Sequence, residues 1–462
     1  MRRHPAGMRC LSPVGANKSV RLKTIMMTSS AVAPAALEAR TIHKLRMRII
    51  PFVFVLYVIA FLDRINIGFA ALTMNKELAI ASQQFGFVSG IFFFGYFIFE
   101  IPSNLLPHKI GARIWIARIM ISWGILAILS GFVQTVFHLY VLRFLLGVAE
   151  AGYLPGILLY LTYWFRQRQL AHAFALFGTA NPVTSILGAP LSGVILDHVH
   201  WFGISSWRWL LILEGIPAIL GGVFTYFLLP GRPAEARFLT TEEKDWLTAE
   251  LAREAQQKQA RSPITAGQAL VHGRVWHLVA IFFTALIGSY TMVFWMPQVL
   301  KAFSTQYSNT TVGFLVMIPY LVGLPVMILV ARHSDRTLER RYHAAVPAII
   351  GAISLMLLGA METRSILFSV ALWCFVVSGL YSLLPPFWSL PNEFLTGFSA
   401  AAGIALINSI GNLGGFVGPY VMGAISNKTG SLRGGLVFAG VSLFVSAMLL
   451  LALRKDKQPE AA

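Results

Sequence analysis

The sequence predicts an all-α membrane protein with twelve transmembrane helices in two six-helix, pseudo-symmetric bundles. Of the 462 residues, 56% are hydrophobic and 12% are charged, whereas soluble domains carry about 25% charged residues. Apolar runs long enough for a helix to cross the hydrocarbon layer, which takes roughly 20 residues, recur along the whole chain. A charged and polar stretch at 230–273 separates six such runs from six others.

The twelve spans follow from the apolar runs and their polar boundaries. We place them at 49–71, 84–106, 114–134, 138–163, 170–196, 208–229, 274–299, 309–331, 344–361, 365–386, 397–425 and 434–453. The expected parts are an N-terminal tail (1–48), a first bundle (49–229), a central loop (230–273), a second bundle (274–453) and a C-terminal tail (454–462). The basic first 27 residues are either a tail or an extension before a start at Met26 or Met27.

The charge distribution predicts the orientation of the chain. The net charge is +18, and most of the 37 Lys and Arg residues lie in the tails, the central loop and the short hairpins that face the same side. Such an asymmetry orients a membrane protein with its basic segments inside. We therefore expect an inner-membrane, multi-pass protein with both termini in the cytoplasm, and no nucleic-acid partner.

Two short basic segments occupy corresponding places in the two halves. HKIGAR (108–113) follows the second span, and ARHSDRTLERR (331–341) follows the eighth. Asp335, Arg336 and Arg340 are candidates for an ion-pair latch, and Glu100, near the cytoplasmic end of the second span, is a candidate partner for a basic hairpin. The alternative is that these basic segments serve orientation alone.

Several motifs together carry a family resemblance. They are YVIAFLDRINIGFAAL (57–72), SGIFFFGYFIFEIPSNLL (89–106), RFLLGVAEAGYLPG (143–156), WRWLLILEGIPA (207–218) and AAAGIALINSIGNLGGFVGPYVMG (400–423). In combination they resemble the anion:cation symporter family of the major facilitator superfamily, which includes permeases for tartrate, phthalate and galactonate. The resemblance extends over most of residues 40–455.

The resemblance implies a secondary active transporter with the major facilitator fold. Its expected activity is proton-coupled import, by alternating access, of a small organic acid: a sugar acid, a hydroxy dicarboxylate such as tartrate, or an aromatic carboxylate. Its partners would be that anion, protons and the lipid bilayer, with no cofactor other than the coupling proton, and a monomer is the default for the class. A proton-independent exchanger, an exporter and a transporter-like membrane sensor remain alternatives.

An enzyme is not expected from this sequence. It contains no HExxH pair, no Walker loop and no cysteine cluster, since Cys10 and Cys374 are its two cysteines. Metal hydrolases and nucleotide-dependent enzymes depend on such motifs.

Arg64 in the first span is the leading substrate candidate. A charge inside the hydrocarbon layer is costly and usually has a partner or a function. A guanidinium remains charged and presents a planar fork of donors that matches a carboxylate. Neutralisation of a neighbouring acid is the structural alternative. With a single central arginine, a monovalent carboxylate is the simplest match, and a dicarboxylate would need Arg143 or a proton in addition.

Asp63, Glu150 and Arg143 are the candidates for proton coupling. Arg143 and Glu150 are seven residues apart, which places them on one face of a helix roughly 10 Å apart. In the galactonate-type permeases that this chain resembles, the acids that match Asp63 and Glu150 are the protonation sites. A static Arg143–Glu150 ion pair is the alternative.

The remaining substrate candidates are polar or aromatic residues inside spans. Tyr96 matches the family's substrate tyrosine, with packing as the alternative, and Asn181 stands where the galactonate-type pattern has glutamine. In the second half, Trp388 and Ser389 follow two prolines that break span ten, as occurs where a helix lines a cavity. Asn408 and Asn412 share one face of span eleven and can bond a substrate or a neighbouring helix. Tyr290, Trp295 and Gln298 are weaker candidates.

Overall fold

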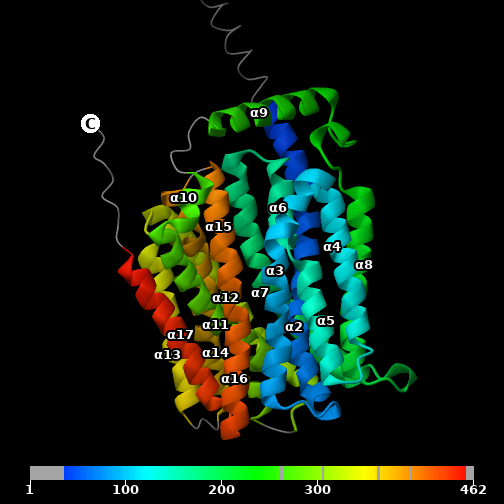
Figure 1. Ribbon diagram of the computed structural model, residues 1–462, viewed down its shortest axis with the longest axis vertical. Coiled ribbons are helices and arrows are strands. Elements are labelled where there is room, and N and C mark those ends of the chain that lie inside the picture. Colours follow the sequence, from blue (N-terminus) through cyan, green and yellow to red (C-terminus); the bar gives the residue numbers. More distant parts are fainter. Residues whose placement is uncertain (1–35, 260–264, 304–305, 362–364, 396, 454–462) are drawn as a thin grey trace, which may run out of the picture.

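The computed structural model describes residues 36–259, 265–303, 306–361, 365–395 and 397–453. In this part of the chain, twelve helices are long and apolar enough to cross a membrane (Figure 1). The predicted fold class and the predicted number of spans are therefore confirmed.

The first half contains six spans. Its first helix begins at Ala36, earlier than the predicted start of the span at 49, and continues through α2 (Ile50–Glu77). The following elements are α3 (Ser82–Ile110), α4 (Ala112–Ser130), α5 (Val136–Glu150), α6 (Tyr153–Thr162), α7 (Gln167–His198), η1 (Trp201–Gly203) and α8 (Ser206–Leu228).

The central segment contains η2 (Pro233–Glu235), α9 (Thr241–Gln259) and α10 (Ala266–Val271). The elements of the second half are α11 (Gly273–Lys301), α12 (Asn309–Thr337), α13 (Arg341–Ala360), α14 (Ile366–Ser389), η3 (Leu390–Glu393), α15 (Gly397–Asn412), α16 (Gly414–Thr429) and α17 (Arg433–Ala452). Together α15 and α16 account for the eleventh span.

The fourth span is not the continuous helix that we predicted over 138–163. The chain leaves helical geometry at Ala151 and enters α6 through Gly152, whose φ of 82° is left-handed. Glycine adopts this conformation without a steric penalty, and Pro155 is tolerated because it lies in the first turn of α6. Glu150 is consequently the last residue of α5, at a helix end inside a membrane span.

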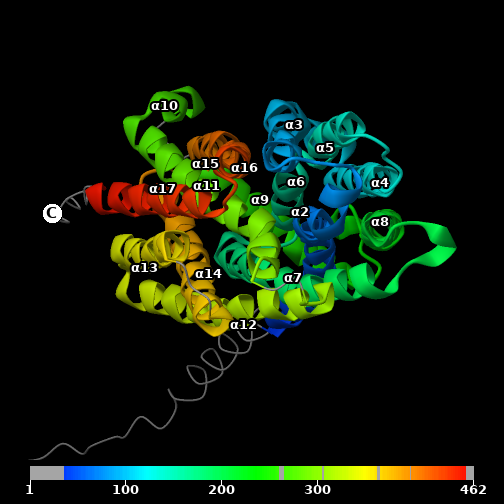
Figure 2. The same ribbon diagram turned by 90° about the horizontal axis from the view of Figure 1, so that it is seen from below.

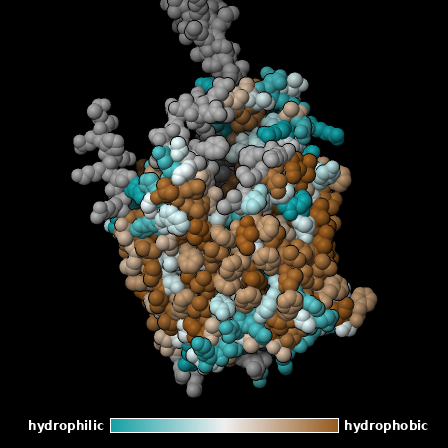
Figure 3. Space-filling model, viewed as in Figure 1, coloured by the Kyte–Doolittle hydropathy of each residue, from teal (hydrophilic) through white to brown (hydrophobic). Residues whose placement is uncertain are grey.

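The two halves lie side by side, and α7 packs against α12 while α3 packs against α16 (Figure 2). On the face shown in Figure 3, apolar residues cover the middle of the molecule, and polar residues gather toward its two ends. An apolar belt between polar ends is what a protein surrounded by lipid requires.

At the end opposite α9, the halves approach each other closely. A Cβ atom on Gly193 of α7 would lie 2.4 Å from the carbonyl oxygen of Asn309 in α12. A Cβ atom on Gly86 of α3 would lie 2.4 Å from the carbonyl oxygen of Pro419 in α16. Helix backbones in membranes approach this closely where small residues leave room. The halves are therefore closed against each other at this end.

At the other end, α9 is docked on the first half (Figure 1). The buried carboxylate of Glu243 accepts hydrogen bonds from Arg40 Nε at 2.8 Å and Lys44 Nζ at 2.9 Å. Burial alone would raise the pKa of Glu243, but the hydrogen bonds from Lys44 and from the Thr240 backbone N–H outweigh it and hold this pKa below its usual value. Glu243 is therefore ionised at neutral pH and ties α9 to the helix that leads into α2.

Candidate functional site

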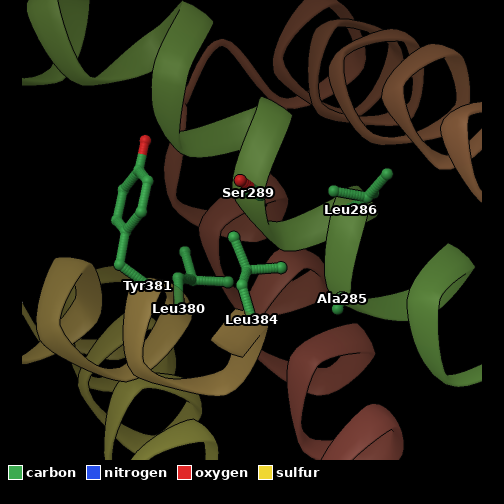
Figure 4. A pocket seen from close by; sticks show the side chains of 6 residues that line it. All are labelled: Ala285, Leu286, Ser289, Leu380, Tyr381 and Leu384. Atoms are coloured by element: carbon green, nitrogen blue, oxygen red, sulfur yellow. The ribbon is translucent and has the colours of Figure 1, made fainter. Parts of the chain in front are cut away.

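A hollow of about 880 Å³, including its solvent-open part, lies between the two halves. Side chains of α2, α3, α5, α6 and α7 line it from the first half, and side chains of α11, α14 and α15 line it from the second. Part of the second wall is visible in Figure 4, where Ser289 of α11 and Tyr381 of α14 border a small adjoining pocket. A ligand in the hollow would contact both halves.

Arg64 supplies the positive charge of this hollow. Among the described residues that line it, Arg64 is the single Lys or Arg. Its Nη2 forms an ion pair with Glu150 of α5, and its Nη1 donates to the Tyr290 hydroxyl of α11 at 3.3 Å. One guanidinium thus bridges the two halves.

Aromatic rings surround the Arg64 guanidinium. Its central carbon lies 5.4 Å from the ring centre of Phe61 and 5.5 Å from those of Phe92 and Tyr96. Cations are attracted to aromatic ring faces at such distances, and the rings also exclude water. The Arg64 side chain is 15% exposed, so it is largely buried but can be reached from the hollow.

Glu150 competes with any anion for Arg64. Its side chain is 2% exposed, and its Oε2 atom has no hydrogen-bond partner in the described part of the chain. The alternative Arg143–Glu150 ion pair is not formed in this structure, because the guanidinium paired with Glu150 is that of Arg64. While Glu150 is ionised, an incoming carboxylate has to displace it. Protonation of Glu150 would remove this competitor.

Asp63 and Arg143 lie behind the hollow instead of lining it. Both side chains are buried. Asp63 Oδ1 accepts from Asn66 Nδ2 at 3.1 Å, and its Oδ2 has no partner among the described residues. The Arg143 guanidinium lies 5.3 Å from the Phe92 ring centre and within electrostatic range of Asp63.

The structure brings most of the predicted substrate residues together. The hollow is lined by Arg64, Tyr96, Asn181, Trp388, Asn408 and Asn412, and also by the weaker candidate Tyr290. Ser389 is not among the lining residues, and its hydroxyl donates to the Pro385 carbonyl at 3.3 Å. This is the common bond of a helical serine hydroxyl back to the carbonyl four residues earlier. The two prolines do not break the helix as we predicted, since α14 continues to Ser389.

The latch candidates divide into two groups. Arg340 Nη1 donates to Asp335 Oδ1 at 2.5 Å, so these two residues form the ion pair. The exposed Arg336 forms no ion pair within the described ranges. Glu100 is fully buried and accepts from Asn408 Nδ2 of α15 at 2.6 Å. Its hydrogen bond therefore crosses between the halves, whereas we expected a basic hairpin as its partner.

Four polar residues of the hollow were absent from the sequence-based set: Tyr57, Tyr153, Ser289 and Tyr381. Tyr57 precedes Arg64 by seven residues, and Tyr381 precedes Trp388 by seven. Two helical turns place each pair on one face, so this spacing could have identified both tyrosines. Tyr153 lies within a motif that carried the resemblance, and nothing in the sequence distinguishes Ser289.

Comparisons with known proteins agree with this architecture. Residues 53–419 match the family model described as Major Facilitator Superfamily. The chain is 47% identical over 422 residues, 91% of this chain and 92% of the relative, to a protein of Agrobacterium vitis named "Putative tartrate transporter". It is 40% identical over 414 residues, 89% of this chain and 93% of the relative, to "Putative metabolite transport protein NicT" of Pseudomonas putida.

A solved structure shares the fold. It is a bacterial homolog of the human lysosomal transporter Spinster, in an inward-facing and occupied conformation, with a TM-score of 0.71 and 15% sequence identity. The match covers 88% of this chain and 96% of that chain.

Proposed function

Because the chain belongs to the major facilitator superfamily, and is thus a multi-pass membrane transporter and not an enzyme, we propose that it imports a small organic acid anion together with protons. Within this class we favour a hydroxy dicarboxylate such as tartrate. The expected location is the inner membrane, with α9 and both termini on the cytoplasmic side.

The Arg64–Glu150 ion pair is the observation that carries this proposal. Arg64 is the cation of a hollow formed by both halves, and its partner is a protein carboxylate at a helix end. The Arg64 guanidinium bonds Glu150 through Nη2 alone, and a substrate carboxylate that displaces Glu150 can be bound by the fork of donors. Protonation of Glu150 and binding of the anion therefore favour each other, which is the linkage that a symporter needs.

The rest of the hollow suits a hydroxylated substrate. The hydroxyl groups of Tyr57, Tyr153 and Ser289 and the amides of Asn181 and Asn412 line it. Hydroxyls both donate and accept hydrogen bonds, and amides offer both donor and acceptor atoms. These groups can pair with the hydroxyl groups of a tartrate molecule without adding charge.

Charge balance favours proton coupling for a dicarboxylate. Because Arg143 is buried behind the hollow, it is not placed to bind a second carboxylate there. Moving one elementary charge across the membrane changes the free energy by about 2.3 kcal/mol per 100 mV of membrane potential. An anion that enters a cell with a negative interior therefore moves uphill, and accompanying protons cancel this cost.

The proposed cycle is alternating access, with the conformation described here open toward the cytoplasm. Support comes from the close helix contacts at Gly193 and Gly86 on the end opposite α9. Rocking of the halves would separate these contacts and expose Arg64 to the other side.

Uptake of radiolabelled L-tartrate into proteoliposomes tests the proposal. An inward proton gradient should drive accumulation, and a protonophore should abolish it. Equal uptake with and without the gradient, together with tartrate counterflow, would identify a proton-independent exchanger. Failure of tartrate and of other organic acids to bind or exchange would reject organic acid transport altogether.

A further inference from the structure

Glu214 of α8 is a buried carboxylate without a role in the proposed cycle. Its side chain is 3% exposed and does not line the hollow. Its Oε1 accepts from Ser192 Oγ of α7 at 3.1 Å, whereas its Oε2 has no hydrogen-bond partner in the described part of the chain.

The surroundings of Glu214 offer it no counter-ion. From α2, Asp63 lies within electrostatic range and Asn66 lies close by. From α7, the neighbour is the uncharged Ser192. Among the described residues, no Lys or Arg forms an ion pair with Glu214, and the nearby titratable group is a second acid.

The α4–α8 contact closes this environment. A Cβ atom on Gly215, the residue after Glu214, would lie 2.9 Å from the carbonyl oxygen of Gly124 in α4. The two charged side chains of α4 are engaged elsewhere: Arg113 pairs with Glu235 at 3.6 Å, and the exposed Arg118 lies over the Trp115 ring at 3.9 Å. Backbone contact of this kind excludes water, so solvent does not replace the missing counter-ion.

An ionised carboxylate in such a place is strongly disfavoured unless a partner offsets the loss of water. Asp63 has such partners, namely the Asn66 amide and the electrostatic attraction of Arg143. Glu214 has the Ser192 hydroxyl and shares the Asn66 amide, but among the described residues no cation attracts it as Arg143 attracts Asp63. Two nearby buried carboxylates repel each other when both are ionised, so one of them is favoured to be protonated. The protonated acid is the one whose ionised form is less stabilised by its neighbours.

We propose that Glu214 holds a proton in this conformation and forms, with Asp63, a second proton-binding site separate from the Arg64–Glu150 pair. This deepens the coupling part of the proposed function and rests on it. The proton passes between the two acids as the Glu214 O–H bond breaks and an Asp63 O–H bond forms, which leaves Glu214 as the carboxylate.

The position of Glu214 suits a route by which protons would reach the site from the closed end of the molecule. Glu214 follows the first residue of α8 by eight positions, and Ser192 precedes the last residue of α7 by six. At 1.5 Å per residue, both lie roughly 10 Å from the end that is closed here. Asp63 connects this site to the other one, because it interacts electrostatically with both Glu214 and Glu150.

Infrared spectroscopy of the purified full-length protein at neutral pH tests the site without any substrate. A protonated carboxyl group has a C=O stretching band that a carboxylate lacks. Difference spectra between the wild type and Glu214→Gln should show the loss of one such band. The matched control is Glu242→Gln, which changes an exposed carboxylate on α9 and should leave the band intact.

Ser192→Ala keeps the test decisive even where Glu214→Gln does not fold. Loss of the Ser192 hydrogen bond should shift the Glu214 band to higher frequency. A carboxylic acid band that is unchanged in Ser192→Ala and in any folded Glu214→Gln protein overturns the proposal.

A transport measurement tests the coupling role of Glu214 separately. If wild-type protein takes up tartrate with protons, Glu214→Gln should lower the proton-to-tartrate ratio, and an unchanged ratio would refute a coupling role. If wild-type protein transports no organic acid, the proposed function fails, while the infrared result still decides whether Glu214 holds a proton.

Discussion

Asp197, near the end of α7, accepts hydrogen bonds from both the backbone N–H and the side-chain amide of Asn309 at the start of α12, at 3.1 and 2.8 Å. Its other oxygen accepts from the backbone N–H of Thr310 at 2.7 Å. Because α7 belongs to the first half and α12 to the second, a single carboxylate fastens the two halves at their closed end. The free N–H groups at a helix start also favour a negative charge there.

Asp197→Asn should loosen this fastening. Hydrogen bonds to a charged acceptor contribute about 1.5–3 kcal/mol when buried, and partial exposure here reduces that value. We expect the open form of this end to rise roughly tenfold in population, equivalent to 1.4 kcal/mol. Spin labels at Gln134 and Lys428, in a protein whose native cysteines are replaced, report the separation of the halves at this end.

Glu77→Gln is the matched control for Asp197→Asn. Glu77 accepts from Trp207 Nε1 at 2.8 Å and from Arg208, both of which lie in the same half as Glu77. The label distance should not change in this variant. Equal distances in the wild type and Asp197→Asn would show that the carboxylate does not hold the halves together.

Arg64→Lys should weaken substrate binding although the charge is retained. An ammonium group cannot reproduce the two parallel bonds of a guanidinium, and loss of one charge-assisted bond costs about 1.5–3 kcal/mol. We expect the Kd for tartrate, measured by calorimetry, to rise roughly 10- to 100-fold. Arg118→Lys, at an exposed position of α4 that does not line the hollow, is the control, and equal affinity in both variants would exclude a bidentate role for Arg64.

Glu150→Gln should separate exchange from accumulation. The amide has no charge to hold Arg64 and no proton to release, so tartrate counterflow should continue. In a proton gradient, steady-state accumulation should fall at least roughly tenfold. Accumulation equal to that of the wild type would place the coupling proton on another residue.

The docking of α9 should depend on pH through Glu243. Because the hydrogen bonds hold the pKa of Glu243 below its usual value in the folded protein, their stabilisation is present well above the unfolded value of 4.5 and is lost as pH falls through the folded pKa. A label pair on the exposed residues Arg253 of α9 and Ile110 of α3 should therefore show a broadening distance distribution in acid.

Glu243→Gln should show this broadening already at neutral pH, and its difference from the wild type should shrink as pH falls. Glu242→Gln is the control, because its carboxylate is exposed and lies 3.7 Å from Arg40. A wild-type distribution in Glu243→Gln at neutral pH would mean that other contacts hold α9.

The sequence predicted the spans and the central cation because each is a local signal. An arginine in an apolar run, such as Arg64, stands out whatever its neighbours are. The helix break at Gly152 also had a local signal, since glycine and the nearby Pro155 disfavour a continuous helix, but the length of the apolar run argued for one span.

Partners across helices could not be predicted in the same way. Spacing along one helix suggested Arg143 as the partner of Glu150, whereas the structure pairs Glu150 with Arg64, 86 positions away. Glu100 was assigned to a nearby basic hairpin, yet it bonds to Asn408 in the other half. Such contacts depend on how α2, α3, α5 and α15 pack, which no spacing within a single helix encodes.

The pairing of Arg64 with Glu150 also bears on the empty carrier. If Arg64 had no counter-ion in the empty carrier, the return of the empty carrier to its outward-facing state would move a positive charge through the membrane potential. Because Glu150 is the counter-ion of Arg64, the pair is neutral when no substrate is bound. In the proposed cycle, the return of the empty carrier would then move no net charge at this pair, and the membrane potential would act there only when substrate and protons are bound.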